Sequence, residues 1–178
     1  MSLEESHYPP PEILTPTGWN NNLQAANSPR DYHGTAVLLP DARIFVGGGE
    51  NRTGDYEIFS PPYLTAGLPR PINVRLEDLN GVQLPSEILG YDSKFMAISE
   101  DLPLGTVVNK VCLIAPGSTT HHSDMSQRYH EMTISSVKPH AVKFTTPIDD
   151  RVMPRGFYML WMVTNIGTPS NAVWIQLQ

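Results

Sequence analysis

The sequence predicts an all-β protein in which a small antiparallel sheet precedes a β-sandwich. Glycine and proline are abundant, with 13 and 17 residues respectively, and charged residues make up only 17% of the chain, against about 25% in an average globular protein. Short apolar runs bounded by turn residues recur along the chain, and no stretch shows the periodicity of an amphipathic helix. Strands and turns are therefore expected almost throughout.

Length and charge exclude several classes of function. A chain of 178 residues is long enough for one average domain or two small ones. The formal net charge is -6, so the clustered positive charge that binds phosphate backbones is missing and no nucleic acid is expected as a partner. The longest apolar run, residues 158–163, is too short for a membrane span. The first residues lack the basic start and apolar segment of a signal peptide.

Residues 1–66 are predicted to form a loop-rich segment followed by a three-stranded sheet. The opening segment is polar and rich in proline, with one short strand near Ile13. Two apolar runs, residues 35–39 and 43–46, flank a Pro-Asp turn and predict a β-hairpin, and a third strand is expected at residues 56–59. Three such strands make up most of one propeller blade. Because the unpaired edges of a sheet recruit partners, we expect residues 34–60 to pack on the sandwich or on a second copy of the chain. Packing on a second copy would give a homo-oligomer.

Residues 67–178 are predicted to form a separate immunoglobulin-like sandwich. Pro69-Arg70-Pro71 breaks both helix and ladder, which places a boundary near residue 67. One helical turn is predicted within residues 84–89, with Pro85 at its first position. Strand candidates then recur at the spacing of a sandwich. These candidates are residues 72–75, 94–99, 107–115, 131–135, 141–146, 157–164 and 172–177.

The single cysteine, Cys112, excludes an intrachain disulfide and every CxxC motif. It lies inside the apolar run 111–114, so we expect a buried thiol that acts as a small apolar side chain. The methionine and aromatic residues of the run 157–163 are likewise predicted to lie in the sandwich core.

Four motifs stand out between residues 29 and 178. They are Asp31 to Asp41 with Val46 to Gly49, Tyr56 to Leu64 with Arg70-Pro71, Pro116 to His121 with Gln127-Arg128, and Gly156 to Leu160 with Asn165, Gly167, Pro169-Ser170 and Trp174. In this order they resemble the last kelch-like propeller blade, the propeller exit, the metal-ligand loop and the C-terminal hairpin of galactose oxidase and glyoxal oxidase. The resemblance implies a partial kelch-like blade followed by an immunoglobulin-like Early set (E-set) domain.

This resemblance implies a copper site formed by Tyr32, His33 and His121. In that family two tyrosines and two histidines hold copper, and one tyrosine and one histidine are neighbours. By that match, His33 and His121 would bind as neutral imidazoles, and Tyr32 would also accept the substrate hydroxyl proton as general base. Imidazole and phenolate suit Cu(II). Since adjacent side chains of a strand point to opposite faces, Tyr32 and His33 need an irregular turn to reach one ion, and Gly34 would supply it.

The resemblance also implies a reaction, for which this chain is incomplete. The parent enzyme would be a secreted oxidase that converts a primary alcohol or aldehyde and reduces O2 to hydrogen peroxide. The family's second tyrosine is linked to a cysteine and holds a radical, and nothing here matches that pair because Cys112 is not in a propeller loop. We therefore expect the chain alone to be inactive and to bind copper weakly.

Three alternatives stay open from the sequence. A non-catalytic β-sandwich module that binds carbohydrate or protein would retain the scaffold without the chemistry. His121 and His122, with Asp124 and His130, also offer nitrogen and oxygen ligands for zinc, although their offsets are irregular. A shift of one residue would make His122 the ligand in place of His121.

Overall fold

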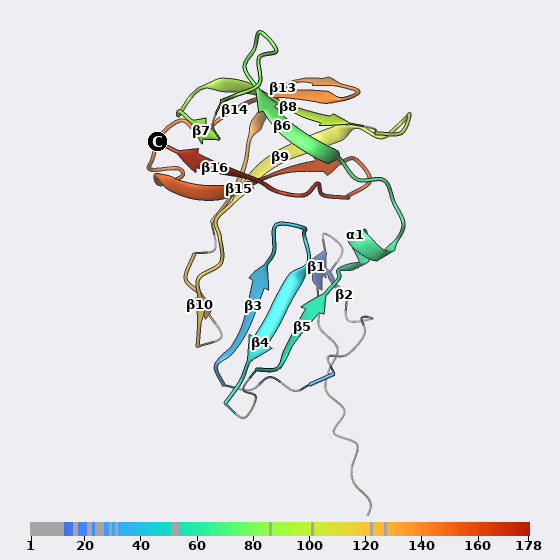
Figure 1. The fold of residues 1–178 in the computed structure, drawn as a ribbon, viewed down its shortest axis with the longest axis vertical. Coiled ribbons are helices and arrows are strands. Elements are labelled where there is room, and N and C mark those ends of the chain that lie inside the picture. The colour runs from blue at the N-terminus through green and yellow to red at the C-terminus, as the bar shows by residue number, and fades with distance from the viewer. Residues whose placement is uncertain are drawn as a thin grey trace, which may run out of the picture.

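The protein consists of a β-sandwich and a separate three-stranded sheet (Figure 1). The computed structural model describes residues 13–15, 18–20, 23, 27, 28, 30, 32–50, 54–85, 87–100, 102–121, 123–126 and 128–178. Within these ranges helix is confined to the four residues of α1 (Pro62–Thr65), so the all-β prediction is confirmed. No helix in the described ranges has the length and apolarity needed to cross a membrane.

The sandwich contains a five-stranded and a four-stranded sheet. All seven predicted strand regions of residues 67–178 are present, although the candidate 131–135 is divided into two strands that belong to different sheets. The division falls at Met132, which is 3% exposed. In sheet order, the strands are β12 (Tyr129–Glu131), β9 (Val108–Ile114), β15 (Gly156–Thr164), β16 (Val173–Leu177) and β7 (Ile88–Leu89), then β13 (Thr133–Lys138), β14 (Ala141–Thr145), β8 (Lys94–Glu100) and β6 (Ile72–Glu77).

The predicted helical turn at residues 84–89 is wrong. Residues 88 and 89 form β7, which pairs in parallel with Gln176 and Leu177 of β16. Leu89 is fully buried in the sandwich core. Burial of this side chain and pairing at a sheet edge therefore outweigh the local preference for a proline-initiated turn.

Strand β15 is buried on both of its faces from Tyr158 to Met162. Alternate residues point to opposite sides of a strand, and Leu160 and Met162 lie in the sandwich core. Met159 and Trp161 lie instead in a second cluster with Cys112, outside the sandwich. The prediction that the whole run 157–163 lies in the sandwich core is thus correct for one face only.

The second cluster joins the sandwich to the three-stranded sheet of β3 (Gly34–Leu38), β4 (Ile44–Gly48) and β5 (Tyr56–Phe59). Leu38 and Ala42, from the β3–β4 hairpin, and Tyr63 of α1 pack against it. The guanidinium of Arg70 adds hydrogen bonds to the carbonyls of Asp41, Pro169 and Ser170. Packing of the three-stranded sheet on the sandwich is therefore confirmed, whereas pairing with a second copy stays a prediction.

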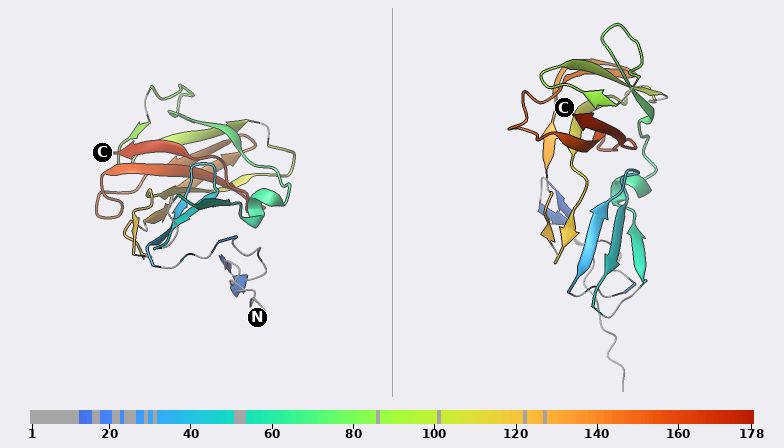
Figure 2. Two further views of the ribbon diagram at one scale, coloured as in Figure 1. Left: turned by 60° about the horizontal axis from the view of Figure 1, so that its bottom comes forward. Right: turned by 60° about the vertical axis from the view of Figure 1, so that its left-hand side comes forward.

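Two small hairpins complete the described structure. The single strand predicted near Ile13 is one arm of a hairpin, β1 (Ile13–Thr15) with β2 (Gly18–Asn20). The other hairpin, β10 (Thr119–Thr120) with β11 (Ser123–Asp124), leaves the sandwich and extends alongside β3. Figure 2 shows this extension in its right-hand view, where the gold hairpin descends from the sandwich beside the light-blue strand β3.

Candidate metal site

The three residues predicted to bind copper come from two segments that meet. Tyr32 and His33 form a turn directly before β3, and β3 begins at the end of the three-stranded sheet that is remote from the sandwich (Figure 1). His121 lies at the tip of the β10–β11 hairpin, between its two strands. The hairpin therefore brings a residue of the sandwich domain to the start of β3.

The rings of all three residues converge. The ring centroids of Tyr32 and His33 are 4.1 Å apart, those of His33 and His121 are 4.8 Å apart, and those of Tyr32 and His121 are 5.6 Å apart. Tyr32 is 48% exposed, and both histidines are also exposed. The structure thus places two imidazoles and a phenol together at an accessible surface, with His33 and His121 separated by 88 positions (121 − 33) in the chain.

The irregular turn needed to align Tyr32 and His33 occurs at His33 itself. Its φ is 66°, which is uncommon for a residue with a side chain. Gly34, predicted to provide the turn, is instead the first residue of β3 and pairs with Gly48. Gly48 is the glycine that the turn requires, because a Cβ there would lie 2.5 Å from the carbonyl oxygen of His33.

The β10–β11 hairpin is held by its own side chains. One oxygen of the Asp124 carboxylate, Oδ1, accepts hydrogen bonds from the backbone N–H groups of Ser118 and Ser126, each at 2.9 Å. The hydroxyl of Thr119 donates to the carbonyl of Ala36 in β3 at 3.3 Å. These bonds fix the hairpin internally and attach it to the strand that follows His33.

The imidazole of His121 is oriented by its neighbour. Thr120 Oγ1 and His121 Nδ1 are 2.7 Å apart and share a hydrogen bond. His121 also has a positive φ, 49°, as residues of two-residue hairpin turns commonly do. With Nδ1 engaged, Nε2 is the ring nitrogen that is available to a metal.

The structure does not assemble the described residues of the alternative zinc site into a metal-binding group. His130 lies in β12, where it pairs with Leu113 of the sandwich, and the Asp124 carboxylate is engaged in the hairpin. His122 lies outside the described residues. Among the described residues no group of three or more His, Cys, Asp and Glu could hold a metal, so the converging set depends on the phenol of Tyr32.

Cys112 lies in a different place, beside an apolar pocket of about 240 Å³ between the sandwich and the β3–β4 hairpin. The thiol is 3% exposed, as predicted, and Trp161 is 2% exposed. The indole N–H of Trp161 has no hydrogen-bond partner among the described residues. Tyr129 also lines the pocket, and this cysteine and tyrosine belong to strands β9 and β12 of the sandwich rather than to the three-ring site.

Burial of Cys112 gives a pH-dependent prediction. Desolvation, followed by the charge of Glu131, raises the pKa of the thiol from 9.0 to about 11. Because the folded pKa lies above the unfolded one, the stabilisation is complete below about pH 9 and is lost as the pH rises through about 11, at a cost of about 2 kcal/mol. Urea unfolding at pH 8, 9.5 and 11 should show this fall in the free energy of unfolding. The fall should be smaller in Cys112→Ala, which has no thiol to ionise. Parallel curves for the two proteins would contradict the prediction.

The comparisons with known proteins agree with the motifs. A family model described as "Galactose oxidase-like, Early set domain" matches residues 81–177. "Aldehyde oxidase GLOX1" of Arabidopsis thaliana is 32% identical over 174 residues, which cover 87% of this chain and 27% of that protein. "Galactose oxidase" of Gibberella zeae is 29% identical over 177 residues, which cover 94% of this chain and 24% of that protein. The chain therefore spans about a quarter of the length of these curated relatives.

A solved structure shares the fold. It is described as a novel fungal alcohol oxidase with catalytic diversity among the AA5 family, in complex with copper, and it matches with a TM-score of 0.75 at 23% identity. The match covers 94% of this chain and 35% of that one. Because the family model covers more than half of the sequence, the protein belongs to the galactose oxidase-like Early set domain family.

Proposed function

We propose that this chain supplies three copper ligands and an E-set domain to a copper-radical oxidase. In the proposed reaction a primary alcohol or an aldehyde is oxidised by two electrons, and O2 takes up two electrons and two protons to form hydrogen peroxide. The observation that carries the proposal is the convergence of the Tyr32, His33 and His121 rings, with centroids within 5.6 Å of one another.

The chemistry of the donor set fits copper. Two imidazole nitrogens and one phenol oxygen make up a nitrogen and oxygen set of the kind that Cu(II) prefers in tetragonal sites. His121 is already oriented through Nδ1, and outer hydrogen bonds of this kind tune metal ligands. The exposure of all three residues gives an ion and a small substrate access to the site.

The chain's own residues would have distinct roles. His33 and His121 would hold the metal as neutral imidazoles, and the phenolate oxygen of Tyr32 would take the proton of the substrate hydroxyl. When bound, copper would supply a Lewis acid and an acceptor for one electron. The β10–β11 hairpin would keep His121 at the start of β3 through its bond to Ala36.

The radical-forming group is proposed to lie outside these 178 residues. The one cysteine of the sequence is Cys112, and it is buried beside Trp161 in the cluster between the sandwich and the β3–β4 hairpin. The chain alone would then hold a metal without oxidising a substrate. We further propose that residues 1–66 belong to the last kelch-like blade and residues 67–178 to the E-set domain, in agreement with the separate hydrogen-bonded sheets of the two regions.

The test is electron paramagnetic resonance of the chain with one equivalent of Cu(II). We expect a tetragonal signal that is lost in His33→Ala and in His121→Ala, with Cu(II) affinity at least about tenfold lower in each. Tyr32→Phe keeps the ring and removes the oxygen donor, so it should weaken binding and abolish the phenolate-to-copper absorption band.

His140→Ala is the matched control, because His140 is an exposed histidine at the β13–β14 turn and lies outside the three-ring site. Its copper signal should equal that of the unmodified chain. A signal that persists in both ligand variants would refute the proposed site and would favour a non-catalytic sandwich module.

A further inference from the structure

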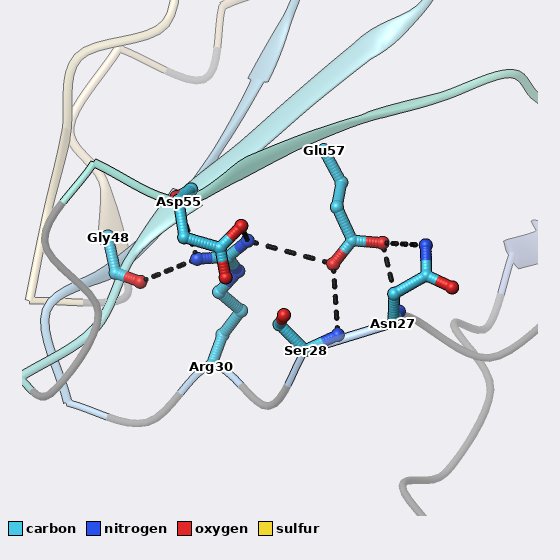
Figure 3. A network of polar contacts seen from close by, with 6 residues as sticks. All are labelled: Asn27, Ser28, Arg30, Gly48, Asp55 and Glu57. Carbon is cyan, nitrogen blue, oxygen red and sulfur yellow. Dashed lines mark hydrogen bonds and ion pairs between the residues drawn. The ribbon is translucent and has the colours of Figure 1, made fainter.

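Arg30, two residues before Tyr32 in the sequence, is the centre of a polar network (Figure 3). Nη1 of Arg30 donates to the backbone carbonyl of Gly48 at 3.0 Å and to that of Asp55 at 2.9 Å. Nη2 lies 3.5 Å from the carboxylate of Asp55 and 3.6 Å from that of Glu57. One guanidinium therefore connects the segment before β3 to the end of β4 and the start of β5.

Glu57 completes the attachment of the same segment. Its carboxylate accepts hydrogen bonds from the backbone and the side-chain amide of Asn27, at 2.9 and 3.0 Å, and from the backbone of Ser28 at 3.2 Å. The bond from the Asn27 backbone is the main cause of the lowered pKa of Glu57. Asn27, Ser28 and Arg30 are thus held through Glu57, and the Arg30 side chain is only 10% exposed.

The network is not needed to pair the strands of the sheet. β3 and β4 are joined by a continuous register from Gly34 with Gly48 to Leu38 with Ile44, and β4 and β5 by a second one. Arg30 itself has no strand partner among the described residues, and its guanidinium reaches Gly48 and Glu57 from outside the ladders. Its contacts therefore hold the backbone at Arg30, two residues before Tyr32, and do not contribute to the pairing of the strands.

Gly48 links the network to the candidate ligands. Its carbonyl receives the Arg30 hydrogen bond, and its Cα faces the His33 carbonyl so closely that a Cβ would lie at 2.5 Å. The His33 turn is thus confined between Gly48 on one side and the Arg30 attachment two residues upstream of Tyr32. Such a restraint is needed because His33 has an uncommon positive φ of 66°.

We infer that Arg30 is a positioning residue, whose contacts with Gly48, Asp55 and Glu57 hold the Tyr32–His33 turn so that the His33 ring faces His121. The inference rests on the proposed function in so far as this ring pair binds copper. The geometry of the pair itself is a property of the metal-free chain, and it can be measured separately.

The experiment is nuclear magnetic resonance of the metal-free protein with isotope-labelled histidine. Ring centroids 4.8 Å apart should give nuclear Overhauser effects between the His33 and His121 ring protons. We expect these effects to be lost in Arg30→Ala and to be partly retained in Arg30→Lys, because an ammonium can donate to the Gly48 and Asp55 carbonyls but lacks the second nitrogen facing Glu57. The amide spectrum of the sandwich should be unchanged in both variants.

Arg43→Ala is the matched control. Arg43 belongs to the same sheet region and pairs with Asp41 at 2.6 Å, but it is 46% exposed and lies at the opposite end of the β3–β4 hairpin. In Arg43→Ala the nuclear Overhauser effects between the His33 and His121 rings should equal those of the unmodified chain. Retention of the His33–His121 effects in Arg30→Ala, or their equal loss in Arg43→Ala, would overturn the inference.

Cu(II) titration of the same proteins separates the inference from the proposed function. If both hold, Arg30→Ala lowers Cu(II) affinity by about 10- to 100-fold, as expected for a residue that orients ligands. If the ring effects are present in the unmodified chain and lost in Arg30→Ala, but no copper binds through His33 and His121, the proposed function fails and the positioning role of Arg30 stands.

Discussion

Phe144→Ala is expected to lower the free energy of unfolding by about 3–5 kcal/mol, the usual cost of deleting a large buried ring. Phe144 lies in β14, in the middle of the four-stranded sheet, and is fully buried. Its ring centroid is 6.2 Å from that of Phe95, its cross-strand partner in β8. Alanine would leave a cavity between the two sheets and remove this aromatic contact.

Urea unfolding followed by circular dichroism measures the effect. Phe157→Ala is the matched control, because Phe157 lies in β15 of the same sandwich but is 62% exposed. Its substitution should change the free energy of unfolding by less than about 1 kcal/mol. Similar losses in both variants would show that the core does not lie between the two sheets as described.

Sequence patterns located the strands well because most of them are short apolar runs between turn residues. The predicted strand at residues 56–59 coincides with β5 (Tyr56–Phe59), and the hairpin before it differs only by one or two residues at its ends. The strand β15 was predicted, but its two faces could not be distinguished. A strand that is covered on both sides forms a continuous apolar run, without the alternation that separates a core face from a solvent face. The contact of its second face with Leu38 and Tyr63 depends on the three-stranded sheet and cannot be read locally.

The sequence named three residues whose rings converge, and their binding of a metal stays a prediction; it did not name the side chains that hold their backbone. The motifs name Tyr32, His33 and His121, and the structure brings their rings together. Sequence reasoning missed the contribution of Arg30, since a basic residue in a polar, proline-rich segment carries no local signal for partners 18 to 27 positions away. It also assigned the turn to Gly34, although the triple glycine 47–49 offered a hint, because close approach between two strands is a common reason for glycine.

Substitution of Gly48 is the other change expected to have a large effect on stability. Gly48→Ala is expected to destabilise the protein by about 2–5 kcal/mol, since a left-handed residue with a side chain costs about 1–2 kcal/mol and forcing extra volume into a packed contact about 1–3 kcal/mol more. Gly48 has a φ of 76°, and an added Cβ would meet the His33 carbonyl at 2.5 Å. That contact is backbone, so no side-chain rotation can relieve it, and the His33 turn or β4 must move.

Gly67→Ala isolates the contact from the backbone conformation. Gly67 has a similar φ of 67°, with no atom within 4 Å of an added Cβ, so its substitution should cost only about 1–2 kcal/mol. Both changes reduce the freedom of the unfolded chain equally, and this contribution cancels when the two variants are compared by urea unfolding. The remaining difference measures how tightly β4 holds His33. Equal destabilisation by the two substitutions would mean that Gly48 is needed for its φ alone, and that the His33 turn is free to adjust without it.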